Sequence, residues 1–91
     1  MISNTIGIKI TDALRARDEI RLSTLKLLST SLSYEKIAKQ RELSAEEEIM
    51  IVRREIKKRE EAIEYYKRAQ ATDRVETEQK EIEILQEFLP E

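Results

Sequence analysis

Few side chains in this 91-residue sequence could carry out chemistry. Acyl or amido transfer needs a nucleophile beside an activating base, and the chain contains no cysteine and no histidine. Its clustered serines fall in one predicted helix without a neighbouring base: Ser23, Ser29, Ser31 and Ser33. The sequence has neither a glycine-rich phosphate loop nor a G-x-S-x-G elbow. We therefore predict no catalytic residue and no cofactor.

Three consecutive carboxylates, Glu46, Glu47 and Glu48, are the one group that suggests a metal. A hard cation prefers several oxygen ligands, so the run is compatible with such a site. Acidic residues at a helix start are also stabilised by the helix dipole. We favour the dipole explanation and predict no metal site.

Four basic residues are the best candidates for contact with phosphate groups: Arg53, Arg54, Lys57 and Lys58. Their spacing places them on one side of a helix, opposite its apolar stripe. Contacts of this kind position an RNA backbone and do not distinguish bases. A solvated helix face is the simpler interpretation, and the nearby Glu55, Glu60 and Glu61 favour it.

Arg59 interrupts the apolar stripe of the same helix. If the chain turns near Ala71, Arg59 faces the region from Glu78 to Ile82, and Glu78 also lies on an apolar stripe. We predict a cross-helix ion pair between Arg59 and Glu78. Two alternatives remain: Arg59 extends its charged end into water, or it holds a phosphate or carboxylate of a ligand.

These residues are positioned by two antiparallel helices between Ser44 and Glu91. Ser44 and Glu47 have the spacing of a capping box, and an apolar stripe follows from Ile49 to Tyr66. The first of these helices spans about 26 residues, or about 39 Å. The second opens at Thr72 or Asp73 and is stopped by Pro90.

Two further helices precede this hairpin. The first is capped by Ser3 or Asn4 and extends to about Arg15, with Ile6, Ile10 and Leu14 on one face. The second begins after Asp18 and extends to about Gln40. Its expected buried face carries four leucines: Leu22, Leu25, Leu28 and Leu32. Leu27 widens that face.

Composition supports an all-α fold of four helices, two short N-terminal helices packed on a long antiparallel helical hairpin. The chain contains one glycine and one proline, too few for the many turns of an all-β fold. It has no apolar run of about 20 residues that could span a bilayer. No secretion signal is visible at the N-terminus, so we expect a cytoplasmic protein.

Charge is unevenly distributed along the chain. Residues 1–41 contain eight basic and four acidic residues, whereas residues 42–91 contain nine basic and fifteen acidic residues. The basic half could meet an anionic partner such as RNA. Equally, the two halves could pack on each other with complementary charge.

The order of segments resembles the GatB/YqeY family. The resemblance rests on RLSTLKLL, KQRELSAEEEI, REIKKREEAIEYYKRA and, most specifically, ETEQKEIEILQEFLPE. It implies that residues 1–91 are one N-terminal helical domain, with the smaller C-terminal helical domain of typical members absent. Similar domains form the tail of the GatB component of aspartyl/glutamyl-tRNA amidotransferase and occur in some glutaminyl-tRNA synthetases.

The resemblance implies a role in tRNA-dependent amidation, through contact with tRNA or with an amidotransferase or synthetase partner. It implies neither a membrane nor DNA as a partner. The family term, carbon–nitrogen ligase with glutamine as amido-N-donor, belongs to the larger enzyme. Gln70 and Ala71 replace a usual Gly-Arg pair at the turn, and Arg74 replaces an apolar residue. The first change puts the turn geometry in question, because glycine suits a left-handed helix end.

Overall fold

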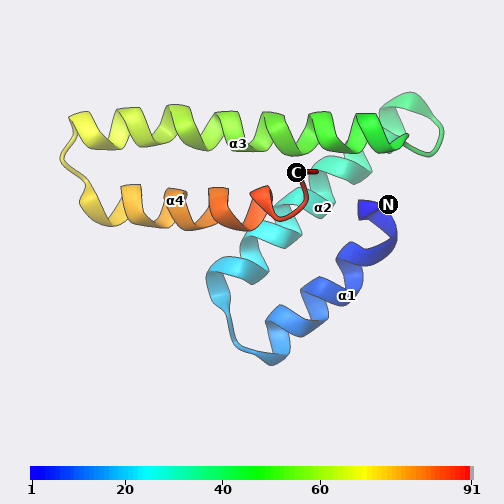
Figure 1. Ribbon diagram of the computed structural model, residues 1–91, viewed down its shortest axis with the longest axis horizontal. Coiled ribbons are helices and arrows are strands. Elements are labelled where there is room, and N and C mark those ends of the chain that lie inside the picture. Colours follow the sequence, from blue (N-terminus) through cyan, green and yellow to red (C-terminus); the bar gives the residue numbers. More distant parts are fainter. Residues whose placement is uncertain (91) are drawn as a thin grey trace.

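Four α-helices joined by short connections make up the computed structural model, which describes residues 1–90 (Figure 1). They are α1 (Ile2–Arg15), α2 (Glu19–Lys39), α3 (Ala45–Arg68) and α4 (Thr72–Gln86). Residues 1–90 contain no strand. The predicted all-α fold class is therefore confirmed.

The helices form two antiparallel pairs. α3 and α4 lie side by side, while α1 packs against α2 in a second hairpin that crosses one end of the first (Figure 1). α2 contacts both α3 and α4 and so joins the pairs. Two short N-terminal helices were expected. α2 has 21 residues and is longer than α4, which has 15, so of these two helices only α1 is short.

The core lies where α2 meets the α3–α4 hairpin. Leu25, Leu28, Val52 and Leu85 are each at most 1 % exposed, and Ile6 brings α1 onto the same cluster. Burial of such side chains contributes about 2 kcal/mol each to stability. Two sequence expectations are wrong here, since Leu14 and Leu27 face solvent with 60 % and 51 % of their surface exposed.

Two predicted helix starts are confirmed. The side chain of Asp18 accepts a hydrogen bond from the Arg21 N–H at 3.1 Å. At α3, the Ser44 hydroxyl accepts from the Glu47 N–H at 3.2 Å, and the Glu47 carboxylate accepts from the Ser44 N–H at 2.8 Å. This reciprocal pair is the predicted capping box.

The expected caps of α1 are wrong, because Ser3 and Asn4 already lie inside the helix. Glu48, which belongs to α3, caps the start of α1 instead. Its carboxylate accepts hydrogen bonds from the backbone N–H groups of Ile2, at 3.0 Å, and Ser3, at 2.9 Å. The Glu48 side chain is 1 % exposed. A carboxylate of α3 therefore satisfies N–H groups that α1 would otherwise leave unpaired.

The turn between α3 and α4 keeps a left-handed helix end without glycine. Gln70 adopts φ 57°, and its N–H donates to the Lys67 carbonyl at 3.1 Å. The Ala71 N–H donates to the Tyr66 carbonyl at 2.9 Å. These two bonds define a Schellman motif and end α3 after 24 residues. α4 begins at Thr72, one of the two predicted starts, but its N-cap is Ala71, because the chain re-enters a helix immediately after this motif.

The last described residues fold back onto the core. α4 ends at Gln86, before Pro90, and Phe88 and Leu89 pack partly buried against the core cluster. The Arg21 guanidinium of α2 donates to both carboxylate oxygens of Glu87, at 2.9 and 3.1 Å. This bidentate pair fastens the end of α4 to the first turn of α2.

Candidate nucleic-acid interface

The four basic residues singled out in the sequence lie together on the outward face of α3. We call Arg53, Arg54, Lys57 and Lys58 the basic band. All four are exposed, whereas the intervening Glu55 and Ile56 are buried with the core. The helix therefore presents four cationic side chains to solvent over about one and a half turns.

Two members of the basic band have acidic neighbours. Arg54 lies 3.9 Å from a carboxylate oxygen of Glu35 on α2, and Lys58 lies 3.1 Å from Glu55. Both cations remain more than half exposed, so these pairs are worth little and leave the charge accessible. Arg53 and Lys57 have no ion-pair partner within 4.0 Å in residues 1–90.

Four of the eight cations in residues 1–41 pair with acids of residues 42–91. Arg21 contacts Glu87, Lys36 contacts Glu42, and both Lys39 and Arg41 contact Glu47. Complementary packing therefore accounts for much of the charge asymmetry along the chain. Arg15, Arg17 and Lys26 are exposed and, like Arg53 and Lys57, have no ion-pair partner within 4.0 Å in residues 1–90.

Arg59 lies in a buried charged cluster between α3 and α4, together with Glu55 and Glu81. It is 8 % exposed, and its Nη1 donates to the Glu55 carbonyl at 2.9 Å and lies 3.4 Å from the Glu55 carboxylate. Its Nε lies 3.9 Å from Glu81 and donates no hydrogen bond. The nearest acid on α4 is thus Glu81, three residues beyond the expected Glu78, because the hairpin register brings that turn of α4 against Arg59. The arginine does not extend into water.

Burial raises the pKa of the Glu81 carboxyl, and the neighbouring Glu78 carboxyl raises it further. The positive charge of Arg59 acts in the opposite direction. Desolvation prevails over the single nearby cation. The cluster therefore holds a carboxyl group that accepts a proton more readily than an exposed glutamate does.

Two of the three carboxylates at the start of α3 accept hydrogen bonds at helix starts. Glu47 belongs to the capping box and also accepts two hydrogen bonds from Arg41, which hold its pKa far below the usual value. Glu48 caps α1, and Glu46 is exposed in the first turn of α3. Residues 1–90 contain no group of three potential ligands that could hold a metal ion.

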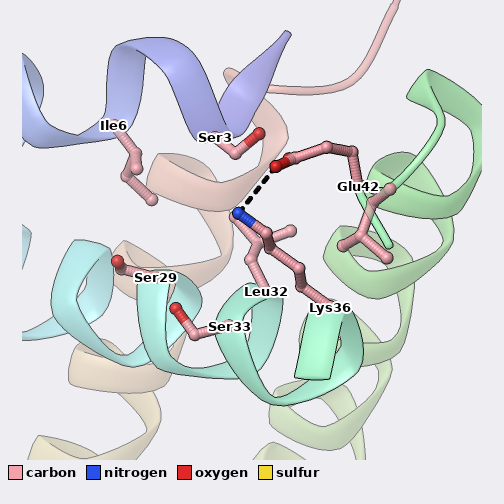
Figure 2. Close-up of a pocket in the computed structure, with 8 residues that line it drawn as sticks. Ser3, Ile6, Ser29, Leu32, Ser33, Lys36 and Glu42 are labelled. Carbon is pink, nitrogen blue, oxygen red and sulfur yellow. Dashed lines mark ion pairs between the residues drawn. The ribbon is translucent and has the colours of Figure 1, made fainter. Parts of the chain in front are cut away.

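Two of the four clustered serines, Ser29 and Ser33, border a small cavity between α1, α2 and the α2–α3 connection (Figure 2). Its volume is about 170 Å³, and Ser3, Ser29 and Ser33 line it. The cationic side chain beside them, Lys36, is held by Glu42 at 2.8 Å (Figure 2). Glu42, the carboxylate that lines this cavity, is thus paired with Lys36, and within residues 1–90 no serine of the cavity donates a hydrogen bond to it.

An aromatic cluster that the sequence analysis does not predict lies at the far end of the α3–α4 hairpin. Tyr65 is 67 % exposed, and its ring meets that of Tyr66 edge-on at 5.6 Å between centroids. The Arg74 guanidinium lies 5.8 Å from the centre of the Tyr66 ring. The adjacent tyrosines beside Lys67 and Arg68 were the signal that could have identified this cluster.

No helix within residues 1–90 is both long and apolar enough to cross a membrane.

Comparison with known proteins relates the chain to one family and to a fungal relative. A family model described as Yqey-like protein matches residues 3–91. An uncharacterized protein of Schizosaccharomyces pombe is 30 % identical over 83 residues, which cover 91 % of this chain and 68 % of that protein. Both matches extend over nearly the whole four-helix unit.

Proposed function

The chain belongs to the YqeY-like family, and from this premise we propose that it is a non-catalytic helical module that binds tRNA through the basic band on α3. The resemblance to the amidotransferase tail domain supports a role for such binding in tRNA-dependent amidation. In that setting the module holds the RNA, and another protein performs the chemistry. Residues 1–91 then act as the N-terminal helical domain of the family.

The observation that carries this proposal is the exposure of the basic band. Its four cations lie on one rigid helix, and none of them is buried by another element. Phosphates carry most of the affinity in RNA binding, so four accessible cations on a rigid helix suit contact with an RNA backbone. The absence of cysteine and histidine from the chain removes the most common nucleophile and general base, which favours binding over catalysis.

The test is the affinity for unfractionated tRNA, measured by fluorescence anisotropy at low salt. Replacing Arg53, Arg54, Lys57 and Lys58 by Ala should weaken binding at least tenfold. A matched control removes four exposed cations elsewhere: Arg15, Arg17, Lys26 and Lys80. If the two quadruple variants bind equally, α3 is not the interface.

A protein-interaction domain without RNA contact is the second candidate function, and α2 favours it. The side of α2 opposite the core carries three exposed apolar residues at helical spacing: Leu27, Tyr34 and Ile37, exposed by 51 to 71 %. A second copy of the chain could cover this surface. Sedimentation velocity tests it, because replacing all three by Ser should abolish self-association, and a strict monomer at high concentration excludes it.

A further inference from the structure

The far end of the α3–α4 hairpin projects away from α1 and α2 (Figure 1). We call Tyr65, Tyr66, Lys67, Arg68 and Arg74 the hairpin tip. Tyr65 exposes 67 % of its surface at this end, on a helix turn that neither α1 nor α2 covers. An aromatic ring held rigidly in water has a large apolar area available for contact with another ring.

The ring of Tyr65 packs against a neighbouring aromatic ring. The edge-on contact with Tyr66, with 70° between the ring planes, fixes one side, and Tyr66 is itself partly buried beneath Arg74. This arrangement leaves a ring whose position is set in advance. Little conformational entropy is therefore lost when a ligand stacks on Tyr65.

Two cations follow Tyr65 in α3, and Arg68, three residues on, lies on the same side of the helix. Lys67 reaches an acid only at 4.0 Å, from Glu64, and Arg68 has no ion-pair partner within 4.0 Å in residues 1–90. A shallow cleft of about 310 Å³ opens beside them between Tyr66, Lys67 and the turn residues Gln70 and Ala71. The hairpin tip thus combines an aromatic platform with accessible positive charge, the combination that single-stranded nucleic acids bind.

One side of α3 connects the basic band to this platform. Arg54, Lys58 and Tyr65 are separated by four and seven residues, so they lie on that side, and the last two are about 10 Å apart along the helix axis. Glu61 lies between them and is exposed, so a phosphate backbone that follows this side passes one carboxylate. Because that carboxylate repels phosphate, Glu61→Gln should strengthen RNA binding about twofold.

We propose that the hairpin tip binds an unpaired nucleobase by stacking on Tyr65, while Lys67 and Arg68 hold the flanking phosphates. This inference rests on the proposed function and extends it from backbone contact on α3 to recognition of a single-stranded segment of the RNA. An exposed tyrosine could also contact a side chain of another protein. Comparing RNA affinity with self-association distinguishes an RNA base from a protein side chain as the ligand.

The test compares single-stranded oligoadenylate of about 12 nucleotides with an RNA duplex of similar length, in fluorescence anisotropy with the full chain. Tyr65→Ala should weaken binding of the single strand by about 5- to 100-fold and binding of the duplex by less than about twofold. Tyr65→Phe keeps the ring and should retain the affinity. Ile8→Ala is the matched control, since Ile8 is 67 % exposed, as Tyr65 is, but lies on α1.

A second readout uses the intrinsic fluorescence of tyrosine, because the chain has three tyrosines and no tryptophan. Stacking should quench emission when oligoadenylate is added, and Tyr65→Phe should remove that quenching while binding persists. If tRNA binds through the basic band but Tyr65→Ala changes neither RNA affinity nor quenching, the stacking inference fails and the proposed function stands. If Tyr65→Ala abolishes self-association but leaves RNA binding intact, the hairpin tip contacts protein and the stacking inference fails. If the wild-type chain binds no RNA at low salt, both fail.

Discussion

The backbone N–H of Ser3 donates a hydrogen bond of 2.9 Å to the carboxylate of Glu48, across 45 residues of sequence. The other oxygen of the same carboxylate accepts from Ile2. The first turn of α1 therefore depends on a side chain of α3. This contact ties the N-terminal hairpin to the helix that carries the basic band.

Replacing Glu48 by Ala should lower the free energy of unfolding by about 2 to 3 kcal/mol, because two partly buried N–H groups lose their acceptor and the dipole of α1 loses its counter-charge. Urea denaturation followed by circular dichroism measures the change. Glu46→Ala is the control, since Glu46 is exposed two residues earlier and should change stability by less than about 0.5 kcal/mol. Equal losses in the two variants would show that the cap contributes nothing.

Replacing Gln70 by Gly should increase the stability of the protein. Its φ of 57° costs a residue with a Cβ about 1 kcal/mol, and Gln70→Gly should recover most of that in thermal or urea denaturation. The same substitution at Gln79, an exposed residue within α4, should instead destabilise by about 1 kcal/mol. Opposite signs at the two positions are the expected result, and a loss at both would contradict the left-handed turn.

Arg59 should couple more strongly to Glu81 than to Glu78, the partner that the spacing predicted. Double-mutant cycles with Arg59→Met, Glu81→Gln and Glu78→Gln measure each coupling in urea denaturation. We expect about 0.5 to 1 kcal/mol for the pair with Glu81 and less for Glu78, because Glu81, unlike Glu78, lies within 4.0 Å of the guanidinium. A larger coupling with Glu78 would mean that the hairpin register is shifted.

Glu81 should make stability fall as pH rises above the ordinary glutamate pKa of about 4.3. Its pKa is raised in the folded state, so between the unfolded and folded values the native chain binds the additional proton. Stability is then greatest at the acidic side of this window and declines towards neutral pH.

The variant Glu81→Gln cannot ionise and should lose this decline. The difference in unfolding free energy, variant minus wild type, should be larger at pH 7 than at pH 4. Glu83→Gln, an exposed change on the same helix, serves as the control. A difference that shrinks on going from pH 4 to pH 7 would reverse the assigned sign.

Much of the fold was predictable because it is encoded locally. The side chains of Asp18 and Ser44 stand next to the helices that they cap, and the spacing of Val52, Ile56 and Ile63 marks the buried side of α3. Features that join distant segments were not predictable. No local pattern shows that Glu48 serves α1, that Arg21 meets Glu87, or that Leu27 turns outward, since each depends on how the two hairpins cross.

The candidate site was predictable to the same extent. Four exposed cations on one face follow from helical spacing alone, and their exposure agrees with that expectation. Which acid faces Arg59 depends on the register between α3 and α4, and the turn at Gln70 sets that register. Spacing alone predicted Glu78, three residues before Glu81, the acid that lies near Arg59. The hairpin tip required knowledge of which end of α3 remains uncovered.

The salt dependence of tRNA binding tests the central claim most directly. Each phosphate contact releases counterions, so the slope of log Kd against log salt concentration counts the cations engaged. The wild-type chain should show a steep slope, and replacing the basic band by Ala should reduce it by about three to four. A slope that is the same in both proteins would contradict the account, because the outward face of α3 would then make no contact with RNA.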